Sequence, residues 1–143
     1  MHSILIAHRD VAYAEKVAAD LGASGYFTLI NCPGPWPPLR CIRCDTGYCP
    51  LTEGADLMIY DPMLSSVDGE GRARRLAVES ALAHPDVPIL LAWSPNAIPD
   101  ASVLRAIRAQ APRVRIAARD PAALRSQVNM LLGDPDPRFE VMT

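Results

Sequence analysis

The feature that most constrains this chain is an alternation of short apolar runs, which predict strands, with apolar residues at helical spacing, which predict helices. The predicted strands are residues 4–7, 27–30, 55–60, 88–93 and 114–117. Helical patterns follow the first, third, fourth and fifth of these runs, at 11–21, at 71–83, after Asp100 and at 121–133. Such an alternation builds an α/β domain, in which helices cover both faces of a parallel sheet.

We expect the five strands to take the flavodoxin-like order 2-1-3-4-5, because the connections are short and parallel crossovers are right-handed. Three carboxylates support the predicted helices, since Asp10, Asp100 and Asp120 stand where an N-cap side chain accepts a hydrogen bond from the first turn. Pro121 suits the first position of a helix. Gly22 is expected to end the first helix.

One helix is missing from the alternation, between the second and third strands. Residues 31–54 show no periodicity and are rich in Pro and Cys, so a Cys-rich loop is predicted in place of the second helix. Residues 1–133 would then form a single domain with this loop inserted. Pro and Asp residues in the segment 134–143 predict a flexible C-terminal tail.

The composition of the 143-residue chain is that of a globular domain, with 50% hydrophobic and 21% charged residues. Its 14 basic and 16 acidic side chains give a net charge of -2, which argues against a dedicated nucleic-acid binder. No apolar run reaches the roughly 18 residues of a membrane span, and the N-terminal residues lack the features of a signal peptide. We therefore expect a soluble cytoplasmic protein without a membrane or nucleic-acid partner.

Four cysteines lie close together between the second and third predicted strands, namely Cys32, Cys41, Cys44 and Cys49. Thiols stay reduced in the cytoplasm, so this density favours metal binding over structural disulfides. The two residues between Cys41 and Cys44 allow both thiolates to reach one ion. Four thiolates complete a tetrahedral site, for which zinc is the usual metal. We predict a four-Cys zinc site that orders the loop.

Other chemistry fits the same cysteines. An Fe–S cluster is also held by four thiolates, although the spacing matches neither the bacterial nor the plant-type ferredoxin pattern. A thiol-disulfide switch would join Cys41 to Cys44 or Cys32 to Cys49. Free thiols that pack as small apolar side chains are the remaining alternative.

The segment ADLMIYDPMLSSVDGE, residues 55–70, is an apolar strand that ends at Asp61 and is followed by a short loop with an acidic residue and a glycine. It resembles the middle of a response-regulator receiver domain, in which Asp61 would be the phosphoacceptor. The runs ILIAHRD and PILLAWSP are similar to the first and fourth strands of that family. The resemblance covers about residues 3 to 132, except 31 to 54.

The metal-binding positions of the family carry different side chains in this chain. A receiver holds Mg2+ with two acidic residues after its first strand, where this chain has His8 and Arg9, and only Asp10 beside them is acidic. An imidazole and a guanidinium are poor ligands for Mg2+, which prefers oxygen. We expect Asp61 to form an ion pair with Arg9 or with Arg119, and Arg9 would then take the place of the metal as a fixed cation.

The switch positions also depart from the family. Its Thr or Ser after the fourth strand aligns with Trp93, or with Ser94 if the register moves by one, and its Lys after the fifth strand aligns with Ala117 or Arg119. The resemblance therefore implies an incomplete phosphoacceptor pocket made of Asp61, Asp10, His8, Arg9, Ser94 and Arg119.

These observations predict a degenerate, or pseudo-receiver, domain that serves signal transduction as a non-enzymatic regulatory or scaffold module. The Cys loop would leave the second strand at the sheet edge that carries Asp61, and its metal site would shape a surface for a protein partner, including a second copy of the chain. One alternative is an Fe–S or thiol-disulfide redox protein. Another is a phosphoacceptor receiver that uses Asp61.

Overall fold

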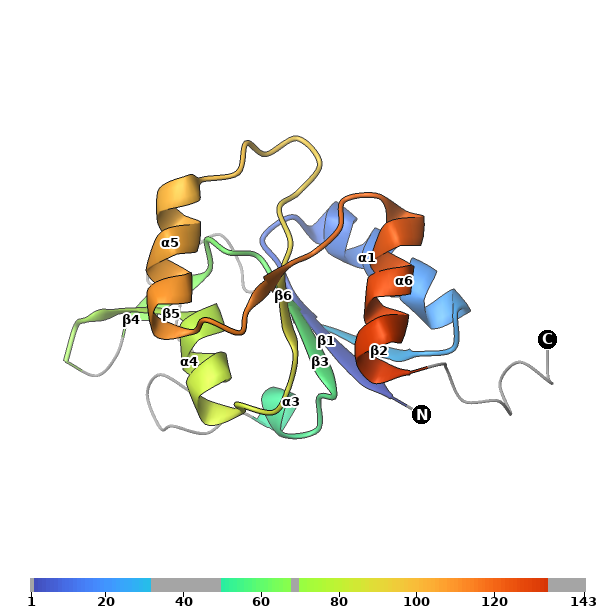
Figure 1. The fold of residues 1–143 in the computed structure, drawn as a ribbon, viewed down its shortest axis with the longest axis horizontal. Helices are drawn as coiled ribbons and strands as arrows, with labels where there is room; N and C mark the ends of the chain where they lie inside the picture. Colours follow the sequence, from blue (N-terminus) through green and yellow to red (C-terminus); the bar gives the residue numbers. More distant parts are fainter. Residues whose placement is uncertain (1, 32–49, 68–69, 134–143) are drawn as a thin grey trace.

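The centre of the molecule is a five-stranded parallel sheet, seen in a computed structural model that describes residues 2–31, 50–67 and 70–133 (Figure 1). Its strands are β1 (Ser3–Ala7), β2 (Phe27–Asn31), β3 (Leu57–Tyr60), β6 (Ile89–Leu91) and β7 (Arg115–Ile116). They lie in the order β2-β1-β3-β6-β7, with every neighbouring pair parallel. Counted along the chain, these five strands have the predicted order 2-1-3-4-5.

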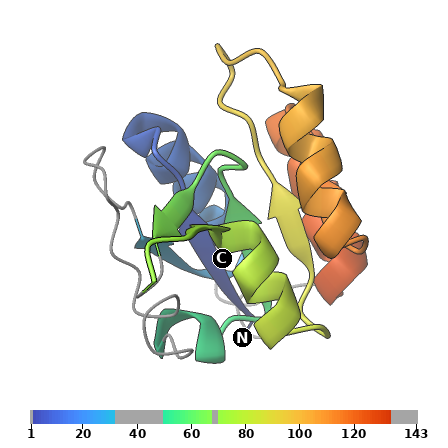
Figure 2. The same ribbon diagram turned by 90° about the vertical axis from the view of Figure 1, so that its left-hand side faces the viewer.

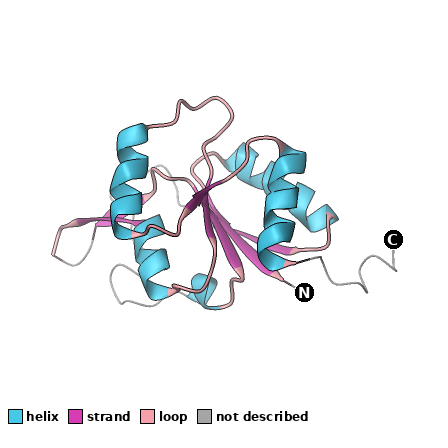
Figure 3. Ribbon diagram, viewed as in Figure 1, coloured by secondary structure: helices cyan, strands magenta, loops and turns pink. Residues whose placement is uncertain are grey.

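Helices cover both faces of this sheet, as Figure 3 shows. Helices α1 (Val11–Ala23) and α6 (Pro121–Leu132) pack on one face, and α4 (Leu76–Ala83) and α5 (Ala101–Gln110) pack on the other. The N-cap predictions are confirmed, because the carboxylates of Asp10, Asp100 and Asp120 accept hydrogen bonds from the first turns of α1, α5 and α6. These caps satisfy backbone donors that have no partner inside the helix.

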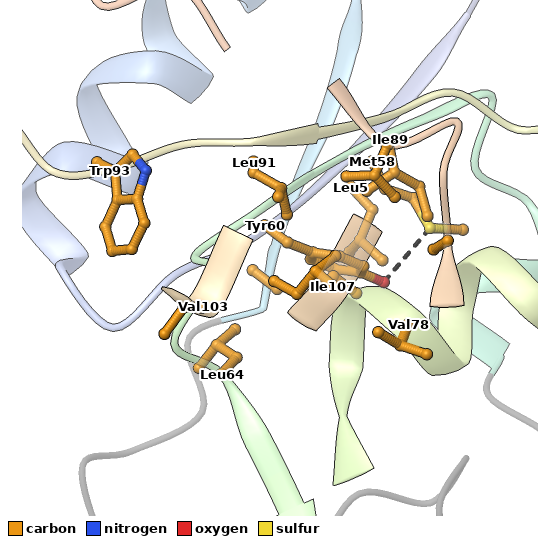
Figure 4. Packing of buried hydrophobic residues seen from close by; sticks show 14 of the residues in the cluster. Leu5, Met58, Tyr60, Leu64, Val78, Ile89, Leu91, Trp93, Val103 and Ile107 are labelled. Carbon is orange, nitrogen blue, oxygen red and sulfur yellow. Dashed lines mark hydrogen bonds between the residues drawn. The ribbon is translucent and has the colours of Figure 1, made fainter. Parts of the chain in front are cut away.

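Alternate residues of each strand face opposite layers of the core. Ile4 and Ile6 of β1 pack with the residues of α1 and α6, whereas Leu5 packs with those of α4 and α5. Figure 4 shows this second layer, with the 3.3 Å hydrogen bond from the Tyr60 hydroxyl to Met58 Sδ as a dashed line. The same hydroxyl lies 2.8 Å from Ser80 Oγ, so the polar end of this buried tyrosine has partners. Each large apolar side chain buried in this way contributes about 1.5–3 kcal/mol to folding.

The prediction of a helix from Gly71 to Ala83 is wrong at its start, because α4 begins only at Leu76. The residues before it form β5 (Ala73–Arg75), which pairs antiparallel with β4 (Ser65–Val67) in a hairpin outside the main sheet. Figure 2 shows the molecule from the hairpin side. Arg75 has an extended backbone, so pairing in the hairpin excludes these residues from the helix. Leu82, near the end of α4, is an apolar side chain that is 62% exposed.

Smaller differences concern the ends of elements. Helix α1 continues through Gly22 to Ala23, and the turn after it is made at Gly25, whose φ of 102° suits a residue without a side chain. The segment predicted to lack regular structure contains a short helix, α3 (Pro50–Glu53). Residues 32–49, with all four cysteines, and the predicted flexible tail at 134–143 lie outside the described residues.

The helices of the described residues are too short, or too polar, to be candidates for crossing a membrane.

Candidate functional site

The candidate site lies at the carboxyl ends of β1 and β3, two neighbouring strands of the central sheet. β1 ends at Ala7 and is followed by His8 and Arg9, and β3 ends at Tyr60 and is followed by Asp61. The Asp61 backbone N–H donates to the Ala7 carbonyl over 2.9 Å, which holds the two strand ends together. In parallel α/β sheets this edge is where functional groups from several strands converge.

Asp61 is a buried carboxylate, 2% exposed, whose two oxygens both accept hydrogen bonds. Arg9 Nε donates to Oδ2 over 2.6 Å, and the Arg9 backbone N–H donates to the same oxygen over 3.3 Å. The backbone N–H of Met63 donates to Oδ1 over 2.9 Å. The predicted pair of Arg9 with Asp61 is thus confirmed.

The charge of Asp61 is compensated inside the chain. A buried carboxylate without a cation or hydrogen-bond donors costs several kcal/mol, and Arg9 supplies the cation while two backbone amides supply further donors. The Arg9 side chain itself is 53% exposed, so solvent screens part of this attraction. The guanidinium therefore stands beside the carboxylate from which a bound metal ion would need an oxygen ligand.

His8 is buried beside this pair and is held at both ring nitrogens. Nε2 lies 2.7 Å from the Ala92 carbonyl oxygen, and Nδ1 lies 3.0 Å from the Asp10 backbone nitrogen. Since the amide can only donate, Nδ1 accepts and Nε2 carries the proton, which makes the ring neutral. The 3.8 Å separation of Nδ1 from Asp61 Oδ2 is then a contact and not an ion pair. His8 joins the ends of β1 and β6.

Asp10 belongs to the helix that follows rather than to the Asp61 pocket. Its Oδ1 accepts from the Tyr13 backbone N–H over 3.1 Å as the N-cap of α1. Among the described residues, no hydrogen bond or ion pair joins Asp10 to Asp61, and no group of three His, Cys, Asp or Glu side chains gathers to hold a metal ion. The local donor set thus offers Mg2+ only one buried carboxylate, already paired with a guanidinium.

Tyr13 packs over His8, with the two ring centroids 4.9 Å apart. Burial raises the pKa of the Tyr13 hydroxyl above its usual range, Arg119 nearby lowers it in part, and Asp10 raises it further. Arg119 donates through Nη2 to the Ala97 carbonyl over 3.2 Å, so it braces the connection between β6 and α5. No ion pair joins Arg119 to Asp61 among the described residues.

Trp93 and Ser94, the candidates for the family's Thr or Ser after β6, do not donate a hydroxyl to Asp61. Trp93, 7% exposed, fills the core on the α4 and α5 side (Figure 4), and its Nε1–H has no hydrogen-bond partner among the described residues. The Ser94 carbonyl accepts from the Ala97 backbone N–H over 3.0 Å in a turn. The structure therefore brings together His8, Arg9 and Asp61 from the predicted pocket, and leaves Asp10, Ser94 and Arg119 in other roles.

Three participants in the site escaped the sequence analysis, namely the Ala92 carbonyl, the Met63 amide and the Tyr13 ring. The first two are backbone groups, which carry no side-chain signal. Tyr13 lies in the first turn of a predicted helix, and His8 precedes that helix, so no helical spacing rule links the two rings. The predicted metal ligands Cys32, Cys41, Cys44 and Cys49 all fall outside the described part of the chain.

No protein-family model and no curated protein matches this sequence. Solved structures do match it. A CheY-like response-regulator receiver domain from Methanospirillum hungatei has a TM-score of 0.60 at 14% identity, covering 91% of this chain and 92% of that chain. A receiver domain from Clostridium thermocellum has a TM-score of 0.60 at 14% identity over 100% of both chains. The chain has the receiver fold.

A third match is the chemotaxis protein CheY4 of Vibrio cholerae, with a TM-score of 0.54 at 12% identity over 92% of this chain and 99% of that chain. At these identities the likeness concerns the path of the backbone, and activity has to be argued from side chains. Within this receiver fold, Asp61 follows the central strand β3, with Arg9 across from it at the end of β1.

Proposed function

We propose that this receiver fold is a non-enzymatic regulatory or scaffold module that acts in the cytoplasm through contacts with a protein partner, without accepting a phosphoryl group. The observation that supports this proposal best is the buried pair in which Arg9 Nε lies 2.6 Å from Asp61 Oδ2. Receiver domains are generally signalling modules. In this module the cation beside the carboxylate would be the guanidinium of Arg9, which cannot dissociate as a metal ion does.

Phosphoryl transfer to Asp61 would need a free carboxylate oxygen and a cation that neutralises the transferred group. Both oxygens of Asp61 already accept hydrogen bonds from Arg9 and Met63. The positions beside the carboxylate are taken by the neutral ring of His8 and the guanidinium of Arg9, which are poor ligands for Mg2+. These side chains favour a resting, non-reacting Asp61.

The test of this part is intact-protein mass spectrometry after incubation with acetyl phosphate and Mg2+. We expect no added phosphoryl mass in the full chain, while a phosphorylatable receiver domain treated in parallel gains it. A gain that disappears in Asp61→Asn would refute the proposal and establish the phosphoacceptor alternative.

The second part of the proposal is a zinc ion held by Cys32, Cys41, Cys44 and Cys49. Its support comes from the sequence, in which four thiolates with a C-x2-C pair fall in one segment of a chain expected to be cytoplasmic. Zinc binding supplies about 10 kcal/mol or more of folding free energy to small sites. The metal would then shape the connection between β2 and α3 into a surface for the partner, which includes the option of a homodimer.

Elemental analysis of anaerobically purified protein tests this second part. We expect a colourless sample with one equivalent of zinc, and loss of that zinc in Cys44→Ser while the sheet stays folded. Visible absorption with stoichiometric iron would replace zinc by an Fe–S cluster. Absence of any metal together with a Cys41–Cys44 or Cys32–Cys49 disulfide would replace it by a redox switch.

A further inference from the structure

A groove of about 1010 Å3 lies at the end of the molecule opposite Asp61. It is lined by the C-terminal ends of α4 and α5, by the residues leading into β6 and β7, and by Leu131 of α6. The groove lies where β6 and β7 begin, whereas Asp61 lies where β3 ends. Because the strands are parallel, the groove and Asp61 are at opposite ends of the sheet. Figure 1 shows α4 and α5, whose C-terminal ends contribute to this lining, next to each other on one face of the sheet.

The groove has an apolar lining with accessible side chains. Leu82 is 62% exposed and Ile116 is 41% exposed, while Ile89 and Val114 of the same lining are buried. Exposed apolar side chains that share one concave surface are more informative than single ones, because together they offer an area that a ligand can cover.

Three arginines give the same groove a positive charge. Arg108, Arg113 and Arg115 line it and are exposed, and none of them forms an ion pair with a described residue. The carboxylate that lines the groove with them is that of Asp86. By contrast, Arg9, Arg72 and Arg74 all have acidic partners elsewhere in the fold. A guanidinium binds a carboxylate through two parallel hydrogen bonds, so three unpaired ones favour an acidic ligand.

The outer edge of β7 is closed to an added strand. Gln127 of α6 donates through Nε2 to the Ile116 carbonyl over 2.9 Å, and its Oε1 accepts from the Ala118 backbone N–H over 2.9 Å. The side-chain amide thereby takes the two backbone groups that a pairing strand would use. Strand addition at these two groups would first have to displace Gln127.

We propose that this groove binds a segment of a partner protein in which carboxylates alternate with aliphatic side chains. The carboxylates would pair with Arg108, Arg113 and Arg115, and the aliphatic groups would cover Leu82 and Ile116. This inference rests on the proposed function only in that the module acts through protein contacts. It involves neither Asp61 nor the cysteines, and it gives that function a surface and a ligand chemistry.

The probe is a fluorescein-labelled synthetic peptide of alternating Glu and Leu, titrated with the full chain and followed by fluorescence anisotropy. We expect saturable binding whose affinity falls about tenfold or more in Arg113→Glu with Arg115→Glu, since each change removes a charged donor and places a carboxylate opposite the carboxylates of the peptide. The matched control is Arg105→Glu with Arg125→Glu, exposed arginines outside the groove with the same change in net charge. Circular dichroism checks that all variants are folded.

Four outcomes would overturn the proposal. The first is that the peptide does not bind. The second is that both double variants weaken binding equally, which would indicate net charge alone. The third is a dimer in sedimentation that Arg113→Glu with Arg115→Glu dissociates, which would make the groove a self-association surface. Binding that appears only after Ser replaces the acidic residues of 134–143 would assign the groove to this chain's own tail. Phosphorylation and zinc assays are unaffected by these variants, so this failure is separable from failure of the proposed function.

Discussion

At the scale of single residues, the candidate site depends on which groups satisfy one buried carboxylate. Asp61 takes its cation from Arg9, and backbone amides complete its hydrogen bonds. His8 adds no charge beside Asp61, because one ring nitrogen donates to a backbone carbonyl and the other accepts from a backbone N–H. At the carboxyl ends of β1 and β3, the negative charge of Asp61 is thus compensated by a side chain of the same chain.

Removing the cation should destabilise the fold. Arg9→Ala leaves Asp61 buried with only the donors of the backbone, and we expect a loss of about 1–3 kcal/mol in the free energy of unfolding, less than for a fully buried pair because Arg9 is half-exposed. Urea denaturation measures the loss. Arg125→Ala, an exposed arginine without a described ion-pair partner, should change stability by less than about 0.5 kcal/mol.

A double-mutant cycle compares the single variants Arg9→Ala and Asp61→Asn with the variant that carries both changes. Because the amide carries no charge that needs compensation, the double variant should lose less stability than the sum of the two single variants. Strict additivity would show that the two side chains do not interact in solution.

A pH dependence follows from Tyr13, whose pKa burial raises above its usual range. The unfolded chain then loses this proton at a lower pH than the folded chain, so stability contributed by Tyr13 is present below about pH 10 and declines as the pH rises above it. Thermal unfolding of the wild type and of Tyr13→Phe between about pH 9 and 11 tests this. The wild type should lose more of its midpoint temperature, and parallel curves would contradict the assignment.

At the scale of elements, side chains that hydrogen-bond to free backbone groups stabilise the starts of three helices and the outer edge of the sheet. Asp10, Asp100 and Asp120 each cap one helix, and the sequence predicts them because a cap residue has a fixed place before the first turn. Gln127 closes the edge of β7 from a neighbouring helix. Contacts of that second kind join distant parts of the chain and leave no local pattern.

Gln127→Ala should open this edge. Two hydrogen bonds to backbone are lost, so we expect a destabilisation of about 1–2 kcal/mol, and the freed groups of Ile116 and Ala118 should increase self-association. Urea denaturation and sedimentation velocity measure these two effects. Asn96→Ala, at an exposed position of the connection between β6 and α5 and outside the groove, is the control and should change neither. An unchanged stability in Gln127→Ala would show that the edge is not held this way.

At the scale of the whole molecule, the alternation of apolar runs with helical patterns was enough to predict the five strands, their order and four of the helices. It did not predict the hairpin, because Ser65–Val67 and Ala73–Arg75 are three-residue strands without alternation, and the second runs directly into a helical pattern. The pair of Arg9 with Asp61 was predictable because both follow adjacent strands. The ties of His8 to Ala92 and Asp10 were not, since they run to backbone groups.

The internal pair also has a consequence for how information reaches this molecule. A metal ion exchanges with the surrounding solution, so its occupancy reports on what the cell supplies, whereas the guanidinium of Arg9 is covalently attached and follows no such supply. Chelators and magnesium depletion should leave this corner of the protein unaltered. Under the function proposed above, a stimulus would therefore reach the protein by a route other than the exchange of an ion at Asp61.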